Sequence, residues 1–288
     1  MKLVLGTQVA EADGSRPLAL EVFDAWFERG GRAFDTAHAY GDGATDAALG
    51  HWLRTRGVRD ECEVIGKGAH TPFCDPEHVT TQLHESLDRL GTDHLDVYLL
   101  HRDDVAVPVG EFVDVLNEHH RAGRIQSFGG SNWTAARIDA ANGYARANDL
   151  VPMTVVSNQL SLARMVQPTY PGTVSAGDPA FRRWLAGHDD ITLIAWSAQA
   201  AGFFAGLQAD GLLAHAWFDA DNLERRRRAE ALAADLGVAP VQVALAWVLH
   251  QGDRVRPIIG PRAVAELDSS LAACEIALTV EQVSWLAG

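Results

Sequence analysis

The chain has 288 residues, of which 47% are hydrophobic, so it can bury a full core, and we expect one domain over residues 1–288. The formal net charge of −14 opposes non-specific attraction to nucleic acid or to an anionic membrane surface. A protein that binds polyanions through its overall charge is therefore excluded, and a phosphate-bearing ligand would need local donors.

The N-terminal segment and the cysteines indicate the cell compartment. Residues 1–14 contain one lysine, a short apolar stretch and no cleavage motif, which predicts a first strand and not a signal peptide. No window approaches 18 uninterrupted apolar residues, so we expect no membrane span. The cysteines, Cys62, Cys74 and Cys274, are odd in number and widely spaced, unlike a secreted disulfide scaffold. We therefore expect a cytoplasmic protein.

Short apolar runs alternate with longer amphipathic segments along the chain. Eight runs predict strands, at residues 2–6, 31–35, 63–67, 95–101, 125–130, 154–158, 192–197 and 255–260. Segments of helical period lie between them, among them 17–30, 76–91 and 134–148. Strands that alternate with helices imply crossover connections and a parallel sheet, and eight such units predict a closed (β/α)8 TIM barrel.

Two insertions interrupt this rhythm, at residues 161–178 and 200–224. Both follow a predicted strand, on the side where barrel enzymes place their substrate loops. The basic run Arg225–Arg228 could indicate an anion site. Such runs usually form a solvated helix face, and that is what we expect here.

Four polar residues lie where predicted strands end: Asp35 and Tyr40, Lys67 and His101. Transfer of hydride to a carbonyl builds negative charge on its oxygen, so the reaction needs a positioned acid. Tyr40 can supply the proton, and a neighbouring Lys67 ammonium is expected to lower the pKa of its phenol. Asp35 can pair with Lys67, and His101 can orient the carbonyl oxygen by donating a hydrogen bond.

Taken singly, each of these residues has a structural explanation, such as a helix cap, a rim tyrosine, a surface lysine or a core histidine. Together they favour a site, because all four fall at strand ends on one face of the predicted barrel.

These residues resemble the motifs of the aldo-keto reductases. The pattern D-x-A-x-x-Y-G occurs at Asp35 to Gly41, the strand-end Lys67 and His101 follow, and GxSN and NQ occur at 129–132 and 158–159. The resemblance covers nearly the whole chain. It implies a (β/α)8 barrel, Asp35, Tyr40, Lys67 and His101 as a catalytic tetrad, a small-molecule carbonyl substrate, and a reduced nicotinamide cofactor bound without a Rossmann domain.

The cofactor face combines this resemblance with the chemistry of the residues. Ser131, Asn132 and Gln159 carry hydroxyl and amide groups suited to a nicotinamide carboxamide, and Trp196 can stack on the ring or belong to the barrel core. Small residues around Gly202 permit backbone amides to approach a pyrophosphate. The full expected set is Gly6, Thr7, Asp35, Ser131, Asn132, Gln159, Trp196, Ser197, Ala198, Gln199, Gly202, Gly260, Arg262, Glu266 and Ser270.

The chain departs from the family pattern at several positions. Ala198 and Gln199 replace a common proline and leucine, and the N-terminal hairpin that commonly closes the barrel floor is missing. Arg262 could hold a 2′-phosphate, whereas a carboxylate at Glu266 would repel one and accept a ribose hydroxyl. We expect NADPH, with NADH as the alternative.

Other sites and functions have weaker support. His70, Cys74 and His78 have a zinc-like spacing, but Pro72 and Pro76 break any helix across them, so we expect no metal. A cofactor-binding regulatory or interaction protein with little turnover remains an alternative, as does an aldolase that uses Lys67 as a Schiff base. The substrate rim is expected to include Phe73, Arg102, Asp103, Trp133 and residues 161–178, and Asp103 with Asp104 favours a hydroxyl-rich carbonyl such as a keto-sugar. The oligomeric state stays open.

Overall fold

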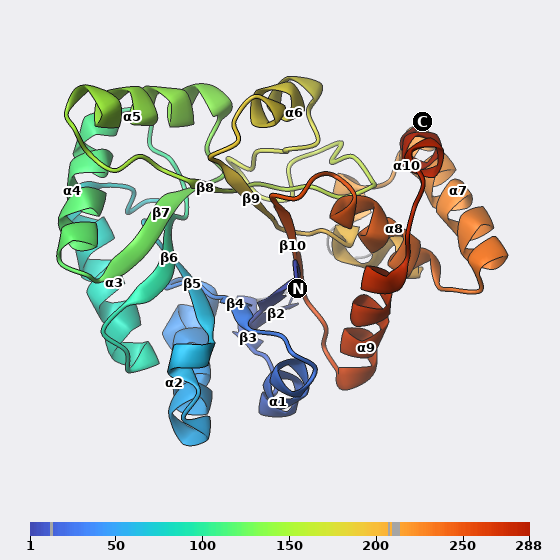
Figure 1. The fold of residues 1–288 in the computed structure, drawn as a ribbon, viewed down its shortest axis with the longest axis horizontal. Coiled ribbons are helices and arrows are strands. Elements are labelled where there is room, and N and C mark those ends of the chain that lie inside the picture. The colour runs from blue at the N-terminus through green and yellow to red at the C-terminus, as the bar shows by residue number, and fades with distance from the viewer. Residues whose placement is uncertain (12–13, 207, 209–213) are drawn as a thin grey trace.

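The computed structural model describes residues 1–11, 14–206, 208 and 214–288. Eight parallel strands close into a barrel in the order β1-β10-β9-β8-β7-β6-β5-β4, and helices surround it (Figure 1). The barrel strands are β1 (Val4–Gly6), β4 (Ala33–Asp35), β5 (Glu63–Gly68), β6 (Leu95–Leu100), β7 (Ile125–Ser131), β8 (Val155–Ser157), β9 (Thr192–Ala195) and β10 (Val255–Ile259). The predicted (β/α)8 TIM barrel is confirmed, and each predicted strand corresponds to one of these eight.

The helices lie outside the barrel and pack their apolar sides against the strands. They are α1 (Leu20–Glu28), α2 (Ala44–Arg56), α3 (Pro76–Leu90), α4 (Val109–Arg121), α5 (Ala135–Ala147), α6 (Pro179–Ala186), α7 (Ala220–Leu236), α8 (Pro240–Leu249), α9 (Val264–Ala272) and α10 (Val280–Ala287). Short 3-10 helices occur at η1 (Tyr40–Gly43), η2 (Arg59–Glu61), η3 (Ala200–Ala205), η4 (Ala214–Ala216) and η5 (Ala273–Glu275).

Helix ends follow local sequence signals. α3 begins with Pro76 and is capped by Asp75, whose carboxylate accepts the backbone N–H of His78 at 2.9 Å. It ends at Gly91, whose φ of 67° is the left-handed conformation that glycine adopts without strain. Thr134 caps α5 in the same way as Asp75 caps α3. These signals explain why the helices predicted at 76–91 and 134–148 form where the sequence places them.

The barrel has an inner and an outer apolar core. The inner core consists of seven inward-facing side chains from six strands, with two from β6 and one from each of the others: Val4, Ala33, Ile65, Val97, Leu99, Val155 and Ile194. The larger outer core lies between strands and helices. Because side chains alternate along a strand, the inward-facing residue that follows the last inner-core residue of a strand lies at the C-terminal end of the barrel.

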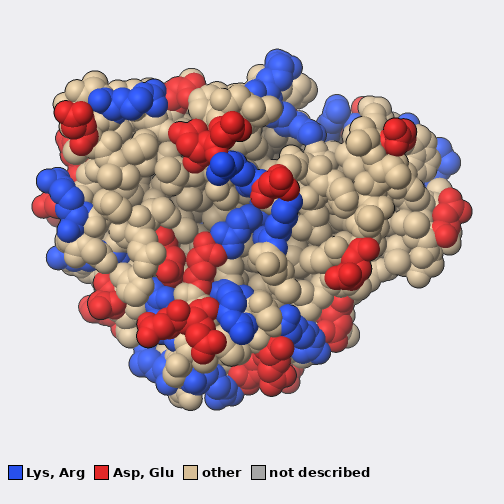
Figure 2. All heavy atoms as spheres, viewed as in Figure 1, with Lys and Arg blue, Asp and Glu red and all other residues tan. Residues whose placement is uncertain are grey.

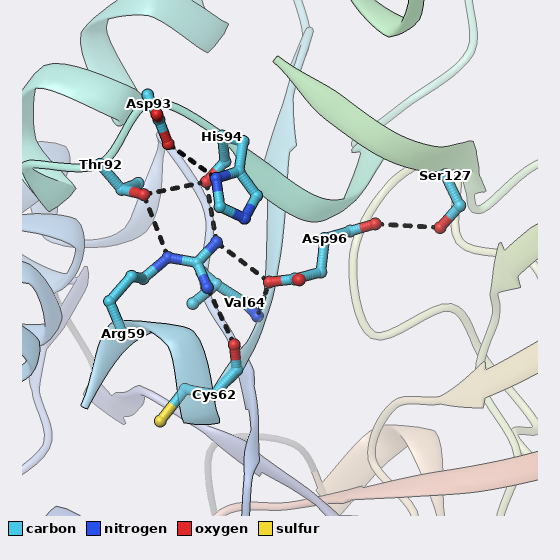
Figure 3. A network of polar contacts seen from close by, with 8 residues as sticks. All are labelled: Arg59, Cys62, Val64, Thr92, Asp93, His94, Asp96 and Ser127. Carbon is cyan, nitrogen blue, oxygen red and sulfur yellow. Dashed lines mark hydrogen bonds and ion pairs between the residues drawn. The ribbon is translucent and has the colours of Figure 1, made fainter. Parts of the chain in front are cut away.

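The opposite end of the barrel is held by polar contacts around Arg59 (Figure 3). Arg59 forms an ion pair with Asp96 at 3.0 Å and donates a hydrogen bond to the carbonyl oxygen of His94 at 2.9 Å. The Asp96 carboxylate also accepts the backbone N–H of Val64, and the hydroxyl of Ser127 donates to the Asp96 carbonyl. The N-terminal ends of β5, β6 and β7 are therefore joined away from the predicted site.

A two-stranded hairpin that the sequence did not predict follows β1. Its strands are β2 (Gln8–Glu11) and β3 (Gly14–Pro17), which pair antiparallel, and it contacts η1 and α2. It therefore stands at the C-terminal face of the barrel, so it differs from a hairpin that precedes the first barrel strand and covers the floor. Among the described residues, no strand precedes β1.

The basic run Arg225–Arg228 is only partly a solvated face. Arg226 pairs with Glu230, and Arg227 and Arg228 both pair with Glu224. Arg225, by contrast, is only 6% exposed. The expectation of a solvated face is wrong for Arg225, because the C-terminal helix α10 packs against α7 and covers it.

Candidate active site

The predicted tetrad meets at the C-terminal end of the barrel because its strands are neighbours in register. Asp35 continues the inward-facing position of Ala33, and Lys67 continues that of Ile65, on the adjacent strands β4 and β5. On the next strand, β6, His101 lies two residues beyond the inward-facing Leu99. The alternation of side chains therefore directs all three polar groups toward the same end of the barrel interior.

Lys67 is the centre of this cluster. Its Nζ lies 2.7 Å from Asp35 Oδ1, and it donates hydrogen bonds to the carbonyl oxygen of Thr36 at 2.9 Å and to the Tyr40 hydroxyl at 3.3 Å. Asp35 and Lys67 are 3% and 2% exposed. A buried ammonium with a carboxylate, a carbonyl and a phenol as partners has its hydrogen-bonding capacity used.

Tyr40 reaches the cluster from η1, which follows β4. The segment between them is held by the backbone hydrogen bond from His38 N to Lys67 O, and the Thr45 hydroxyl donates to Tyr40 O. The ring of His101 stands edge-on to the Tyr40 ring, with 5.6 Å between centroids. Tyr40 is therefore fixed between the Lys67 ammonium and the His101 imidazole.

The pKa values of the pair reflect burial and charge together. Burial raises the pKa of Asp35, although the Lys67 ammonium opposes this shift. For Lys67, burial acts to lower the pKa, but the charges and hydrogen bonds of Asp35 and Tyr40 raise it above its ordinary value. Lys67 is therefore an ammonium and a poor amine nucleophile.

Tyr40 and His101 are both neutral groups here. Burial raises the pKa of Tyr40 and outweighs the Lys67 ammonium, which acts to lower it. The expectation that Lys67 lowers this pKa is therefore wrong in its net direction, because the sequence shows the charge but not the burial. Burial, with the charges of Lys67 and Arg102, puts the pKa of His101 well below its usual range. At neutral pH, Tyr40 keeps its proton and His101 is an uncharged imidazole.

Residues expected at a nicotinamide lie on the next strands around the barrel. Ser131, at the end of β7, pairs in register with Ser157 on β8, and Gln159 forms a bridge with Trp196 beyond β9. The Asn132 amide donates to the Ser131 hydroxyl at 3.1 Å. These polar groups therefore form one continuous arc at the same end of the barrel as the tetrad.

The segment 161–178 closes over this arc. The hydroxyl of Ser175 donates to Gln159 Oε1, and Gln159 Nε2 donates to the Ser161 hydroxyl, both at 2.9 Å. The backbone N–H of Val174 donates to Asn132 Oδ1 at 3.3 Å. An amide group has two N–H donors and two lone pairs, so each side chain keeps capacity for a further hydrogen bond.

Unpaired polar atoms in the arc suit a polar ligand. The Ser157 hydroxyl, the indole N–H of Trp196 and Nδ1 of His101 are buried without a hydrogen-bond partner among the described residues. An unsatisfied buried polar atom is costly, and a bound polar group is one way to satisfy it. Sequence reasoning overlooked Ser157, although its place two residues before Gln159 on an alternating strand could have revealed it.

The loop after β9 has the backbone expected of an anion-binding turn. Positive φ values occur at Ser197 (50°), Ala200 (48°), Ala201 (49°) and Gly202 (87°). Non-glycine residues seldom adopt this conformation, which costs on the order of 1–3 kcal/mol and is commonly kept at binding sites. Ala198, which belongs to this loop, is buried.

The residues expected at the adenosine end lie between this loop and α9. The amide of Gln199 donates to the Ser270 hydroxyl at 3.2 Å. The carboxylate of Glu266 accepts the backbone N–H of Arg262 at 2.7 Å, so the carboxylate turns toward the start of α9. Gly260 and the Arg262 side chain are exposed beside it.

The remaining expected cofactor residues, Gly6 and Thr7, lie where β1 ends, and both contact the adjacent strand β4. The hydroxyl of Thr7 donates to Asp35 O at 3.0 Å, and this holds the strand end that carries the carboxylate. Gly6 pairs in register with Asp35, and a Cβ at Gly6 would meet Ile258 and Ile259 at 3.3 Å.

The expected substrate rim needs two corrections. Trp133 is fully buried, and its indole N–H donates to Arg102 O, so it supports the rim from below. The Asp103 carboxylate accepts hydrogen bonds from Arg137, the shortest from Nε at 2.8 Å and from Nη2 at 2.9 Å. Because Arg137 lies on α5, far away in sequence, this pairing was not visible in the local motif.

Further aromatic side chains lie on segments that follow barrel strands: His70 and Phe73 after β5, and Tyr170 after β8. Phe73 and Tyr170 are each nearly half exposed. The His70 ring is edge-on to His101, with 4.7 Å between centroids. The sequence indicated a role for His70 only through its zinc-like spacing from Cys74 and His78. In the described part of the chain, no group of three or more His, Cys, Asp or Glu is arranged to hold a metal ion.

The fold and the cluster define a barrel enzyme whose site holds a partly buried phenol, an ammonium and a neutral imidazole together. The chain belongs to the Aldo/keto reductase family, whose family model matches residues 2–287. The protein is an oxidoreductase, and this confirms the family resemblance of the strand-end motifs.

Individual relatives agree with this assignment. The chain is 29% identical to "Uncharacterized oxidoreductase YrpG" of Bacillus subtilis, over 97% of this chain and 89% of the relative. It is 30% identical to "Probable aldo-keto reductase 1" of Glycine max, over 88% of this chain and 73% of the relative. It is 25% identical to "Probable aryl-alcohol dehydrogenase AAD4" of Saccharomyces cerevisiae, over 93% of this chain and 86% of the relative.

A solved structure shows the same fold. The thermostable aldo-keto reductase Tm1743, solved in complex with the inhibitor epalrestat, superposes with a TM-score of 0.78 and 22% sequence identity, covering 100% of this chain and 94% of that chain. At this identity the likeness concerns the barrel and not the substrate.

Among the described residues, no single helix combines the length and apolar composition needed to cross a membrane. Helices α7 and α8 meet both criteria only when taken together, as a pair bent by 101°.

Proposed function

We propose that the protein reduces an aldehyde or ketone to an alcohol with NADPH, and that Tyr40 is the general acid. The observation that carries this proposal is the contact of the Tyr40 hydroxyl with the Lys67 ammonium, which is itself paired with Asp35, beside the neutral ring of His101. A reduced nicotinamide supplies the hydride when it is bound. The remaining chemistry belongs to this chain's own side chains.

Tyr40 would donate its proton to the carbonyl oxygen as negative charge develops there. Its raised pKa keeps the proton in place until that moment, and an alkoxide is a much stronger base than a phenolate, so the transfer is downhill. Lys67 would stabilise the phenolate that remains. Asp35 keeps Lys67 charged, and the neutral imidazole of His101 has one N–H with which to orient the carbonyl oxygen.

The residues of the arc would hold the cofactor. Ser131, Asn132 and Gln159 have donors and acceptors for a carboxamide, and the Trp196 ring can stack on the nicotinamide. The loop from Ser197 to Gly202 would present backbone N–H groups to the pyrophosphate. Gly260, Arg262, Glu266 and Ser270 would meet the adenosine end, where we propose that Arg262 favours NADPH over NADH.

We propose carbonyl substrates without a requirement for hydroxyl groups. Asp103 together with Asp104 was the reason to expect a keto-sugar, and the Asp103 carboxylate is engaged by Arg137. An aldolase that uses Lys67 as a Schiff base is disfavoured, because that lysine is held as an ammonium by Asp35.

The test is a screen of NADPH and NADH oxidation against aromatic, aliphatic and hydroxylated aldehydes and ketones. We expect oxidation that depends on both the carbonyl and the enzyme, with a reduced aromatic or aliphatic carbonyl as product. If the protein binds the cofactor tightly but none of the carbonyls in the screen supports oxidation of the cofactor, the reductase function is contradicted and a regulatory role is supported. Borohydride trapping of a substrate on Lys67 would contradict it in favour of an aldolase.

A further inference from the structure

A second concave site lies on the outer wall of the barrel, away from the tetrad. Four arginines line a cavity of about 310 Å³ between α6, α7, α8 and the end of α10, and we call it the arginine pocket. They are Arg164 after β8, Arg182 and Arg183 on α6, and Arg225 on α7. Its floor includes the buried side chains of Leu162 and Trp247.

Many arginines elsewhere in the described part of the chain form ion pairs with acidic partners, and these four do not. Arg56, Arg137 and Arg256 form ion pairs with Asp24, Asp103 and Glu63 at 2.5–2.8 Å. Within the described ranges, no carboxylate forms an ion pair with any arginine of the pocket. In a chain with 38 acidic and 24 basic residues, four guanidinium groups that surround one cavity without an ion pair need an explanation.

Two acidic residues lie near the pocket, and neither forms an ion pair with its arginines in the described part of the chain. Asp219 and Asp221, at the start of α7, are the carboxylates whose charges act on Arg225. Asp219 caps α7 by accepting the backbone N–H of Asn222 at 2.7 Å. Burial and the charge of Arg164 lower the pKa values of both Arg182 and Arg225, which shows that the arginines repel one another.

The pocket is nevertheless held in place by specific hydrogen bonds. The fully buried Asn222 accepts both the backbone N–H of Arg164 at 2.8 Å and Nη1 of Arg225 at 3.1 Å through Oδ1. Arg225 Nε donates to the carbonyl oxygen of Ala287 at 3.0 Å. Arg182 donates to Gln251 and lies over the Trp247 ring, 5.7 Å from its centroid. Like charges are therefore positioned before any ligand arrives.

We propose that the arginine pocket binds a small anion of the phosphate class that carries two or more charges, such as a phosphate monoester or a pyrophosphate. Guanidinium groups form paired, charge-assisted hydrogen bonds with phosphate oxygens. A phosphoryl group concentrates two charges and three acceptor oxygens in one tetrahedron, which can meet several arginines at once. A monocarboxylate offers one charge in a plane. Figure 2 shows basic side chains gathered beside α6, at the edge of a face where acidic and basic groups are otherwise interspersed.

This site does not depend on the proposed reductase function. Its residues come from the segment after β8 and from α6, α7, α8 and α10, whereas the expected cofactor residues Arg262 and Ser270 lie after β10 and on α9. A phosphate bound in the arginine pocket would therefore not occupy the place proposed for the cofactor.

The test is calorimetric titration of inorganic pyrophosphate and of acetate into the whole protein, at physiological salt and with saturating NADPH present. The variant is the double substitution Arg182→Gln and Arg183→Gln, whose exposed positions allow the protein to fold. The matched control is Arg226→Gln with Arg227→Gln, which removes the same charge from arginines that are paired with Glu230 and Glu224 outside the pocket.

We expect one pyrophosphate site in the wild type, a ten- to hundred-fold loss of affinity in the pocket variant, less than a two-fold loss in the control, and no measurable binding of acetate. Absent binding in the wild type, equal affinity in the pocket variant, or an equal loss in the control would overturn the proposal. Binding that is seen only when NADPH is left out would also overturn it and would assign the anion to the cofactor site.

Discussion

Removal of the Lys67 ammonium should destabilise the protein in a way that depends on pH. The Asp35 carboxylate is 3% exposed, and Lys67 is its one ion-pair partner in the described chain. A methionine side chain is nearly as long as that of lysine but carries no charge, so Lys67→Met leaves the Asp35 carboxyl buried without its partner. Breaking a buried ion pair from one side costs about 3–5 kcal/mol.

The pH dependence follows from the protonation of Asp35. Burial already raises its pKa, and loss of Lys67 removes the opposing charge, so the folded variant holds a proton that the unfolded chain releases. A carboxyl kept protonated costs about 1.4 kcal/mol for each pH unit above its ordinary pKa near 3.9. The loss should therefore be about 1.5 kcal/mol at pH 5. It should level off at about 3–5 kcal/mol before pH 8, at the pH where keeping the carboxyl protonated costs as much as burying it ionised and alone.

Urea unfolding of four proteins at pH 5 and pH 8 measures this effect: the wild type, Lys67→Met, Asp35→Asn and the double variant. The double variant should recover most of the stability at pH 8, because neither charge is then buried alone. A loss in Lys67→Met that is equal at both pH values, or a double variant no more stable than Lys67→Met, would refute the reasoning.

Three further predictions test other parts of the structure. The wild type should prefer NADPH over NADH by roughly ten- to a hundred-fold, and Arg262→Ala should erase this preference. Glu266→Gln should strengthen NADPH binding. If titration of both cofactors shows that the wild type prefers NADH, then Glu266 and not Arg262 determines the cofactor preference. Gly129→Ala should unfold the protein or destabilise it by more than about 3 kcal/mol, because a Cβ would lie 1.6 Å from a backbone oxygen of the adjacent strand. Gly143→Ala in α5, where a Cβ meets no atom within 4 Å, should instead raise the free energy of unfolding by up to about 1 kcal/mol. Equal denaturation midpoints for the two variants would contradict this prediction. Because the pKa of His101 is far below its usual range, kcat should not change through a histidine titration between pH 5.5 and 7.5, and a single step near pH 6.5 in the rate profile that His101→Gln abolishes would contradict a neutral imidazole.

The sequence predicts the barrel and the tetrad because both depend on local patterns. Eight apolar runs alternate with amphipathic segments, and a polar residue at a strand end must lie at one face of a parallel barrel. Asp35, Lys67 and His101 could therefore be placed together from strand positions alone. The hairpin β2–β3 was missed because residues 8–17 lack a regular alternation of apolar and polar residues.

The failures concern contacts between segments that are distant in the chain. Arg225 is buried by the C-terminal helix, and Asp103 is engaged by Arg137, and neither partner lies in the local motif. The net direction of the Tyr40 pKa was wrong for a related reason. Its sign depends on how far burial exceeds one nearby charge, which is a property of the folded site.

The central claim is that Tyr40 donates the proton in carbonyl reduction, and the most direct measurement compares kcat and cofactor affinity in Tyr40→Phe. We expect kcat to fall about 10²- to 10⁴-fold while the cofactor Kd stays within two-fold, because only the donor is removed. Tyr144→Phe is the matched control, since its hydroxyl donates to Asp114 on the surface, and it should keep wild-type turnover. Near wild-type kcat in Tyr40→Phe would contradict the account.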